Sequence, residues 1–99
     1  MEIKSTKNGT ELTVCPIGRL ETVTAPDLQA FIEENISGVT DLTFDLKELK
    51  YLSSAGLRVL MSAQKIMNKQ GEMRLCNVNE DIMDILDMTG LTDVFEIEE

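Results

Sequence analysis

The chain has 99 residues, of which 42% are hydrophobic and only 4% aromatic, enough to fill one aliphatic core of a small domain. Its formal net charge of -9 disfavours binding to nucleic acid or to an anionic membrane, because both would repel it. No apolar run approaches the roughly 18 residues that a spanning helix needs, and the first residues lack the basic and apolar blocks of a signal peptide, so we expect a cytoplasmic protein.

Residues 2–7 and 12–17 predict the first two strands. They flank Asn8-Gly9, the strongest short signal for a hairpin turn, so we expect these strands to be antiparallel. Pro16 cannot donate a hydrogen bond to a strand ladder, and it therefore predicts an edge position, a bulge or a bend before Gly18.

A helix and a third strand follow. Thr24 is a good capping residue and Pro26 suits a first helical turn, so we expect a helix that ends at about Asn35, before Ser37-Gly38. Residues 42–46 then alternate like a strand that is buried on at least one face.

After a charged loop, a serine pair opens the second predicted helix. Ser53 or Ser54 can cap this helix, which we expect to run to about Gln70 and to stop at Gly71. Residues 73–78 predict the next strand.

The last predicted elements are a short helix and a short strand. Asn79 is a good cap for a helix over 80–88, with Gly90 just past its end, and residues 94–97 look like a final strand. Strands that alternate with helices, with no repeat or linker between them, predict an α/β fold. We expect one domain over 1–99, a mixed β-sheet of four to five strands packed against helices.

The two cysteines and the absence of histidine limit the chemistry of the chain. Cys15 and Cys76 lie in predicted strands, and no histidine is present to complete a metal site or a Cys-His pair. We therefore expect small core residues, no metal site and no cofactor. The usual Ser-His route to a nucleophilic hydroxyl is also missing, which disfavours an enzyme.

Charge is distributed unevenly along the sequence. Residues 51–71 contain three basic residues and no acid, whereas residues 77–99 contain eight acids and no base. At helical spacing, one face of the second helix carries a basic stripe: Arg58, Ser62, Lys65 and Lys69. Such a stripe is often only a solvated face, but it also offers a docking surface of defined sign.

The serine pair suits reversible phosphorylation. We expect the Ser54 hydroxyl to face the unpaired N–H groups of Gly56 and Leu57, where the helix dipole adds about half a positive charge. Arg58 lies four residues further on and can pair with a phosphate dianion. The alternative is that the pair is only a helix cap followed by a small residue for close packing.

Three runs of the sequence resemble the STAS domain family, specifically the bacterial anti-sigma factor antagonists. They are the serine run at 51–60 (YLSSAGLRVL), the run at 18–28 (GRLETVTAPDL) and the run at 88–97 (MTGLTDVFEI). The last two resemble the segment that joins the second strand to the first helix and the closing helix and strand. The three fall in the family's order and, with the pattern between them, cover nearly the whole chain.

The resemblance implies the STAS fold and a partner-switching cycle. Unphosphorylated members of the family bind an anti-sigma factor that is also a serine kinase with a histidine-kinase-like ATPase fold, and the sigma factor is released. The kinase phosphorylates a serine of the antagonist, the complex dissociates, and a serine phosphatase resets the switch. The chain would then be a regulatory binding protein.

Alignment on Gly56 implies that Ser54 is the phosphoacceptor, with Ser53 as the second choice. Ser53 stands where many members carry aspartate, and Ala55 stands where many carry a second hydroxyl. Glu21, where relatives often have aspartate, is either a partner contact or an exposed charge before a helix. The expected partner-binding residues are Glu21, Thr22, Ser53, Ser54, Ala55, Gly56, Arg58, Ser62 and Lys65.

Other interpretations stay open. The same fold could be a phosphorylation-independent adaptor subunit of a lipid transporter or signalling complex, and Ser53 in place of aspartate favours that reading. A nucleotide-binding domain or enzyme would need a phosphate loop or a dinucleotide fingerprint, and the sequence has neither. We expect Asp45 to be a structural acid that accepts hydrogen bonds from loop N–H groups.

Overall fold

The computed structural model describes residues 1–98, which form a sheet of six strands and three helices. In chain order the elements are β1 (Glu2–Asn8), β2 (Glu11–Leu20), α1 (Ala25–Asn35), β3 (Asp41–Asp45), β4 (Leu49–Leu52), α2 (Ser54–Gln70), β5 (Glu72–Cys76), α3 (Glu80–Met88) and β6 (Glu96–Ile97). The α/β fold predicted from the sequence is confirmed, with one strand more than the four to five expected.

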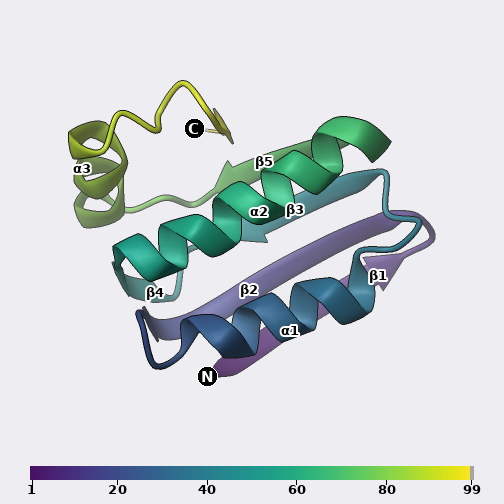
Figure 1. The fold of residues 1–99 in the computed structure, drawn as a ribbon, viewed down its shortest axis with the longest axis horizontal. Helices are drawn as coiled ribbons and strands as arrows, with labels where there is room; N and C mark the ends of the chain where they lie inside the picture. Colours follow the sequence, from purple (N-terminus) through teal and green to yellow (C-terminus); the bar gives the residue numbers. More distant parts are fainter. Residues whose placement is uncertain (99) are drawn as a thin grey trace.

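The sheet is mixed, and two helices cover one of its faces. Its order is β1-β2-β3-β5-β6, with β4 paired to β2; β1 and β2 are antiparallel and the other pairs are parallel. Helices α1 and α2 lie side by side across the sheet, and α3 lies beyond the β4 end (Figure 1). The amino-terminal ends of α1 and α2 therefore lie near the same edge of the molecule.

Strand β2 changes its parallel partner along its length. It pairs with β3 through residues 11–14 and with β4 through Gly18–Leu20. Pro16 lies between these two stretches, so no N–H is needed there for a hydrogen bond to β3 or β4. The register of the β2–β4 pair shifts between Gly18 and Arg19. Strand β2 continues through Pro16, which pairs with Ile3 of β1, so the irregularity lies just after Gly18 and not before it as predicted.

Strand β4 is the element that the sequence prediction missed. We expected a charged loop between β3 and α2, but Leu49 and Leu52 are buried while Lys50 and Tyr51, between them, are exposed. The buried residues are three positions apart, a spacing that fits one turn of a helix and not the alternation of a half-buried strand, so periodicity could not identify β4. The strand forms because β2 offers it a free edge beyond the end of β3.

Two residues at helix ends act differently from the sequence prediction. The Thr24 hydroxyl does not cap α1; it accepts from the Glu21 N–H at 2.9 Å and donates to the Arg19 carbonyl at 2.7 Å, closing the loop before the helix. Gly71 ends α2 in an extended conformation, and a Cβ there would lie 2.0 Å from the Thr40 carbonyl oxygen. Gly71 is therefore required by close backbone packing rather than by a left-handed turn.

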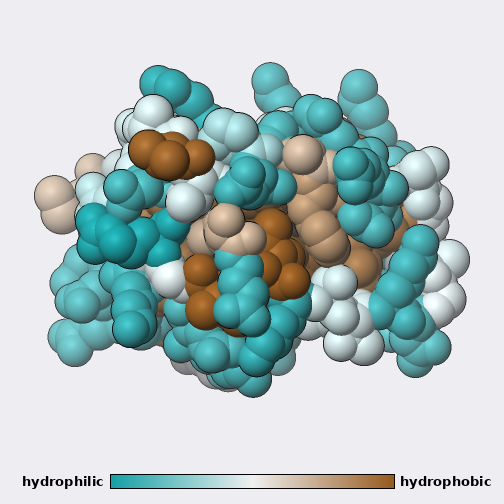
Figure 2. All heavy atoms as spheres, turned by 90° about the horizontal axis from the view of Figure 1, so that it is seen from below, coloured by the Kyte–Doolittle hydropathy of each residue, from teal (hydrophilic) through white to brown (hydrophobic). Residues whose placement is uncertain are grey.

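The hydrophobic core lies between the sheet and its helices. Its largest fully buried side chains are aliphatic apart from Phe44, as the low aromatic content predicted. Seen from the side of β1 and α1, brown hydrophobic side chains show among hydrophilic ones (Figure 2). Partly buried residues such as Ile3 and Phe31 pack against the core. No helix within residues 1–98 has both the length and the apolar composition needed to cross a membrane.

Candidate docking and modification site

Ser53, not Ser54, caps helix α2. Its side-chain oxygen accepts from the Gly56 N–H at 3.4 Å, its carbonyl accepts from the Leu57 N–H at 2.9 Å, and its own N–H donates to the Leu20 carbonyl at 2.9 Å. The expectation that the Ser54 hydroxyl faces the N–H groups of Gly56 and Leu57 is therefore wrong. Those donors point back to the residue before the first helical residue, and that residue is Ser53.

Ser54 is the first residue of α2, and it is exposed. Its side chain makes no hydrogen bond to any other residue in the range 1–98 that the structure describes. Arg58, four residues further along the helix, is also exposed. The Ser54 hydroxyl is therefore available to another protein without disturbing the cap of the helix.

Gly56 supports this end of the helix from beneath. It is buried, and a Cβ added to it would lie 2.7 Å from Leu20 Cγ and 2.8 Å from Leu52 Cδ1. Only glycine lets the first turn of α2 approach the ends of β2 and β4 this closely. Gly56 was predicted as a partner contact, and its environment gives it a packing role.

A cluster of three side chains lies beside the serine pair, and the sequence analysis named only one of them. The Arg19 guanidinium stacks over the Tyr51 ring, 4.3 Å from its centroid, and its Nε donates to Glu21 Oε2 at 2.7 Å. Arg19 and Tyr51 are paired across β2 and β4, so their contact could not be foreseen without β4. Glu21 therefore already has a cationic neighbour within its own chain.

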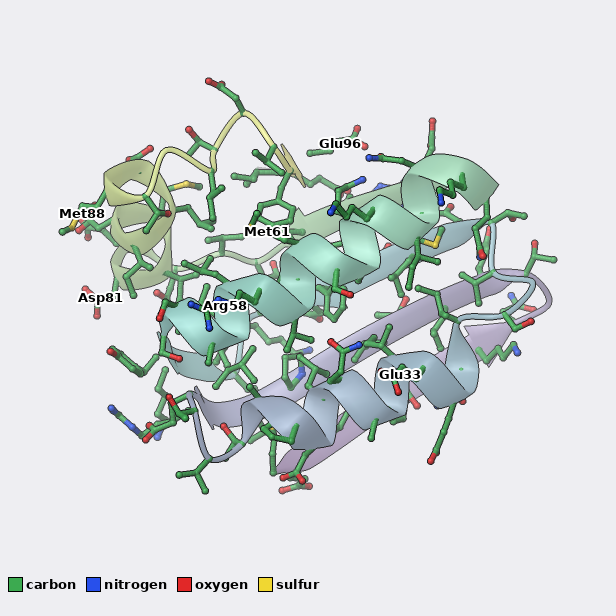
Figure 3. The ribbon with its side chains drawn as sticks, in the orientation of Figure 1. Glu33, Arg58, Met61, Asp81, Met88 and Glu96 are labelled. Atoms are coloured by element: carbon green, nitrogen blue, oxygen red, sulfur yellow. The ribbon has the colours of Figure 1, made fainter. Side chains whose placement is uncertain are left out.

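A groove of about 520 Å³ lies between the first halves of α1 and α2; its lining on α2 begins at Ala55, and Ser54 itself does not line it. Four of the predicted partner-binding residues line it: Thr22, Ala55, Arg58 and Ser62. Its other wall comes from α1, through Ala25, Pro26 and Gln29, which the sequence analysis did not connect with the site. A second hollow of about 280 Å³ lies on the other side of Arg58 and Ser62 and includes Met61 and Lys65. In Figure 3, Arg58 projects near the amino-terminal end of α2 and Met61 lies further along the same helix.

Asp45 has the structural role that the sequence predicted. Its Oδ1 accepts from the Lys47 N–H at 3.1 Å and from Asn77 Nδ2 at 3.0 Å. Burial alone would raise the pKa of Asp45, but the hydrogen bonds from Asn77 and from the Lys47 backbone, with the Lys47 ammonium nearby, bring it below its ordinary value. Asp45 thus holds together the loops that follow β3 and β5.

The two thiols lie in strands, as predicted. Cys15 is buried and Cys76 is half-buried. Burial, reinforced by the negative charge of Asp45, raises the pKa of both thiols, so both are less readily ionised than a free cysteine. No group of three or more metal-ligating side chains comes together within residues 1–98.

The chain folds as a small α/β domain with an exposed serine, Ser54, at the first residue of a helix. The family model for the STAS domain matches residues 2–99, and the chain belongs to that family. It is 29% identical over 98 residues to the anti-sigma-B factor antagonist of Bacillus subtilis (strain 168), covering 98% of this chain and 88% of that protein.

Solved structures give the same fold. An anti-sigma factor antagonist from Mycobacterium paratuberculosis superposes with a TM-score of 0.87 at 22% identity, covering 97% of this chain and 83% of that one. The anti-sigma factor antagonist SpoIIAA in its unphosphorylated form gives 0.77 at 13% identity, covering 99% and 88%. Bacillus SpoIIAA in its phosphorylated form gives 0.76 at 15% identity, covering 99% and 92%. Anti-sigma factor antagonists are regulatory binding proteins rather than enzymes, and their name implies interaction with anti-sigma factors.

Proposed function

We propose that this chain is an anti-sigma factor antagonist whose binding to an anti-sigma factor is switched off by phosphorylation of Ser54. The observation that carries this proposal is that the two serines differ in role: Ser53 caps α2, while the Ser54 hydroxyl is exposed and makes no hydrogen bond within residues 1–98. A phosphate on Ser54 would add about 1.5 to 2 negative charges to the surface without removing a bond that the fold uses.

The effect of the phosphate falls on the partner. A desolvated phosphate or a like-charge contact in an interface costs several kcal/mol, and each ~1.4 kcal/mol is a tenfold loss of affinity. One phosphate is therefore enough to dissociate the complex. The existence of SpoIIAA structures in both phosphorylation states, which match this fold about equally well, supports a switch that leaves the fold intact.

The proposed cycle requires two enzymes. The kinase is the anti-sigma factor itself, with a histidine-kinase-like ATPase fold, and a serine phosphatase restores the free hydroxyl. Because the kinase uses ATP, we place the cycle in the cytoplasm.

Phosphorylation is tested with the anti-sigma factor kinases encoded in the source genome. Each is incubated with the chain and ATP, and the products are mapped by mass spectrometry for wild type, Ser54→Ala and Ser53→Ala. We expect a phosphate in wild type and in Ser53→Ala and none in Ser54→Ala. A phosphate that persists in Ser54→Ala, or none in wild type with every kinase, would contradict the proposal.

Binding is tested with a phosphate mimic. We expect Ser54→Glu to weaken binding to the anti-sigma factor by about a hundredfold or more, which corresponds to roughly 2.7 kcal/mol. Ser37→Glu is the matched control, since Ser37 is exposed and follows the opposite end of α1. Both variants should unfold within a few degrees of wild type. If Ser54→Glu and Ser37→Glu bind the anti-sigma factor with equal affinity, the proposed switch at Ser54 is wrong.

One observation favours a second function, that of an adaptor in a lipid transporter or signalling complex that works without phosphorylation. Ser53 supplies a neutral hydroxyl where the family motif often has a carboxylate, and its bond to the Gly56 N–H is long, at 3.4 Å. An adaptor would remain unmodified at Ser54 with every kinase in the experiment above, and Ser54→Ala would bind its partner as wild type does.

A further inference from the structure

The two hollows beside Arg58 and Ser62 form one continuous surface. Arg58 and Ser62 line both, so they form a low ridge between the groove that α1 shares with α2 and the hollow on the outer face of α2. The groove has small and apolar side chains at its base, among them Ala25 and Val59. The outer hollow contains Met61, whose side chain is 39% exposed although it is large and apolar.

The charge of this surface is opposite to that of the chain. Arg58, Lys65 and Lys69 are exposed, and none of them lies within ion-pair distance of a carboxylate in the part of the chain that the structure describes. The chain has a net charge of -9, yet residues 51–71 contain no acid at all. Positive charge is therefore left uncompensated next to an apolar hollow.

We propose that this face of α1 and α2 docks an acidic amphipathic helix of the protein partner. An apolar side chain of that helix enters the groove beside Val59, and its carboxylates pair with Arg58 and Lys65. This inference rests on the proposed function and specifies the chemistry of the partner's docking segment.

The shape of the surface favours a helix. The gap between two neighbouring helices accepts the side-chain ridge of a third. The lining residues on α2 extend from Ala55 to Lys65, which at a rise of about 1.5 Å per residue is roughly 15 Å, the length of about three helical turns. The net charge of the chain disfavours nucleic acid as the occupant, and the apolar base of the groove gives such a ligand nothing to pair with.

The same arrangement connects docking with the switch. Arg58 lies one helical turn after Ser54, so a phosphate on Ser54 and a partner carboxylate compete for one guanidinium. The phosphate also places negative charge beside the incoming acidic helix. Phosphorylation would then repel the partner at the point where its docking segment enters.

Charge reversal tests the docking surface. The probe is the purified anti-sigma factor from the source genome that binds the unphosphorylated chain, titrated by calorimetry. We expect Arg58→Glu and Lys65→Glu each to weaken binding tenfold to a hundredfold, and Arg58→Gln and Lys65→Gln to weaken it less. Lys7→Glu, the same charge change on the exposed strand β1, should stay within threefold of wild type. Thermal unfolding of each variant verifies that it is folded.

A charge swap identifies the occupant. Glu→Lys and Asp→Lys substitutions along the acidic helices of the anti-sigma factor should include one that restores binding to Lys65→Glu, and affinity for wild type should fall as salt is raised. If wild type binds while Arg58→Glu and Lys65→Glu bind as tightly as Lys7→Glu does, this inference fails and the proposed function stands. If no anti-sigma factor binds wild type, the proposed function fails and this inference fails with it.

Discussion

The amino-terminal ends of α2 and α3 are built in opposite ways. Asn79 caps α3 through a 2.9 Å bond from the Ile82 N–H, donates to the Leu49 carbonyl at 3.0 Å, and is followed by Glu80 and Asp81 in the first turn. At α2 the Ser53 cap bond is 3.4 Å long and the first turn has no acid.

This difference indicates that the start of α3 is built for helix stability and that the start of α2 is not. Acids in a first turn stabilise a helix, and α3 has two, of which Asp81 projects outward in Figure 3. Helix α2 has an exposed hydroxyl at the same place, Ser54, and leaves the positive end of its dipole without a charged neighbour from its own first turn. We interpret the α3 end as structural and the α2 end as reserved for a modification and a partner.

We expect the largest losses of stability from substitutions at the third residue of α2 and of α3. It is Gly56 in α2 and Ile82 in α3, and both are buried. Ile82→Ala should lower the free energy of unfolding by about 2–5 kcal/mol because it leaves a cavity. Gly56→Ala should lower it by about 1–3 kcal/mol because the new Cβ meets Leu20 and Leu52. Urea denaturation measures the free energy of unfolding of both variants. If Gly56→Ala leaves it unchanged, the start of α2 is not tightly packed.

The two caps should differ in strength. Asn79→Ala loses a short cap bond and the bond to the Leu49 carbonyl, so we expect a loss of about 1–2 kcal/mol in the free energy of unfolding. Ser53→Ala loses only the long bond from Gly56, and we expect about 0.5 kcal/mol. Equal losses in urea denaturation would show that the two helix ends are capped alike and would end the comparison.

Asp45 extends the structural side of the comparison to the loop before α3. Asp45→Asn should cost about 1 kcal/mol at pH 7, because the bonds from Asn77 and the Lys47 N–H weaken. The pKa of Asp45 is lowered in the folded state, so this stabilisation is present above its unfolded pKa of about 4 and is lost as pH falls through the folded value. Unfolding curves from pH 7 to pH 3 should show the difference between wild type and variant shrinking only below about pH 4. A constant difference would contradict the role of the charge.

Local signals in the sequence predicted most of the fold. The ends of the three helices at Asn35, Gln70 and Met88 are confirmed, as is the Asn79 cap, because each depends on residues close to it in the chain. Strand β4 was missed because it depends on a free edge of β2, more than 25 residues earlier in the chain.

The site was predictable where a motif marks it and not where distant segments meet. The motif located the serine pair, but only the backbone geometry assigns the cap to Ser53 and exposes Ser54. The contact of Arg19 with Tyr51 and the α1 wall of the groove arise from pairing and packing across the chain, which a single sequence does not report.

The smallest effect separates stability from binding at the two helix ends. Ser54→Asp adds an acid to the first turn of α2, so we expect the free energy of unfolding to rise by about 0.3–1 kcal/mol, and Glu80→Gln in α3 should lower it by a similar ~0.3–1 kcal/mol. Both changes should diminish in high salt, because exposed charges are screened. A Ser54→Asp protein that is slightly more stable and yet has lost its partner would place the effect of the added charge in the interface. If that variant is instead destabilised by more than about 1 kcal/mol, the start of α2 does not accept negative charge, and the contrast with α3 disappears.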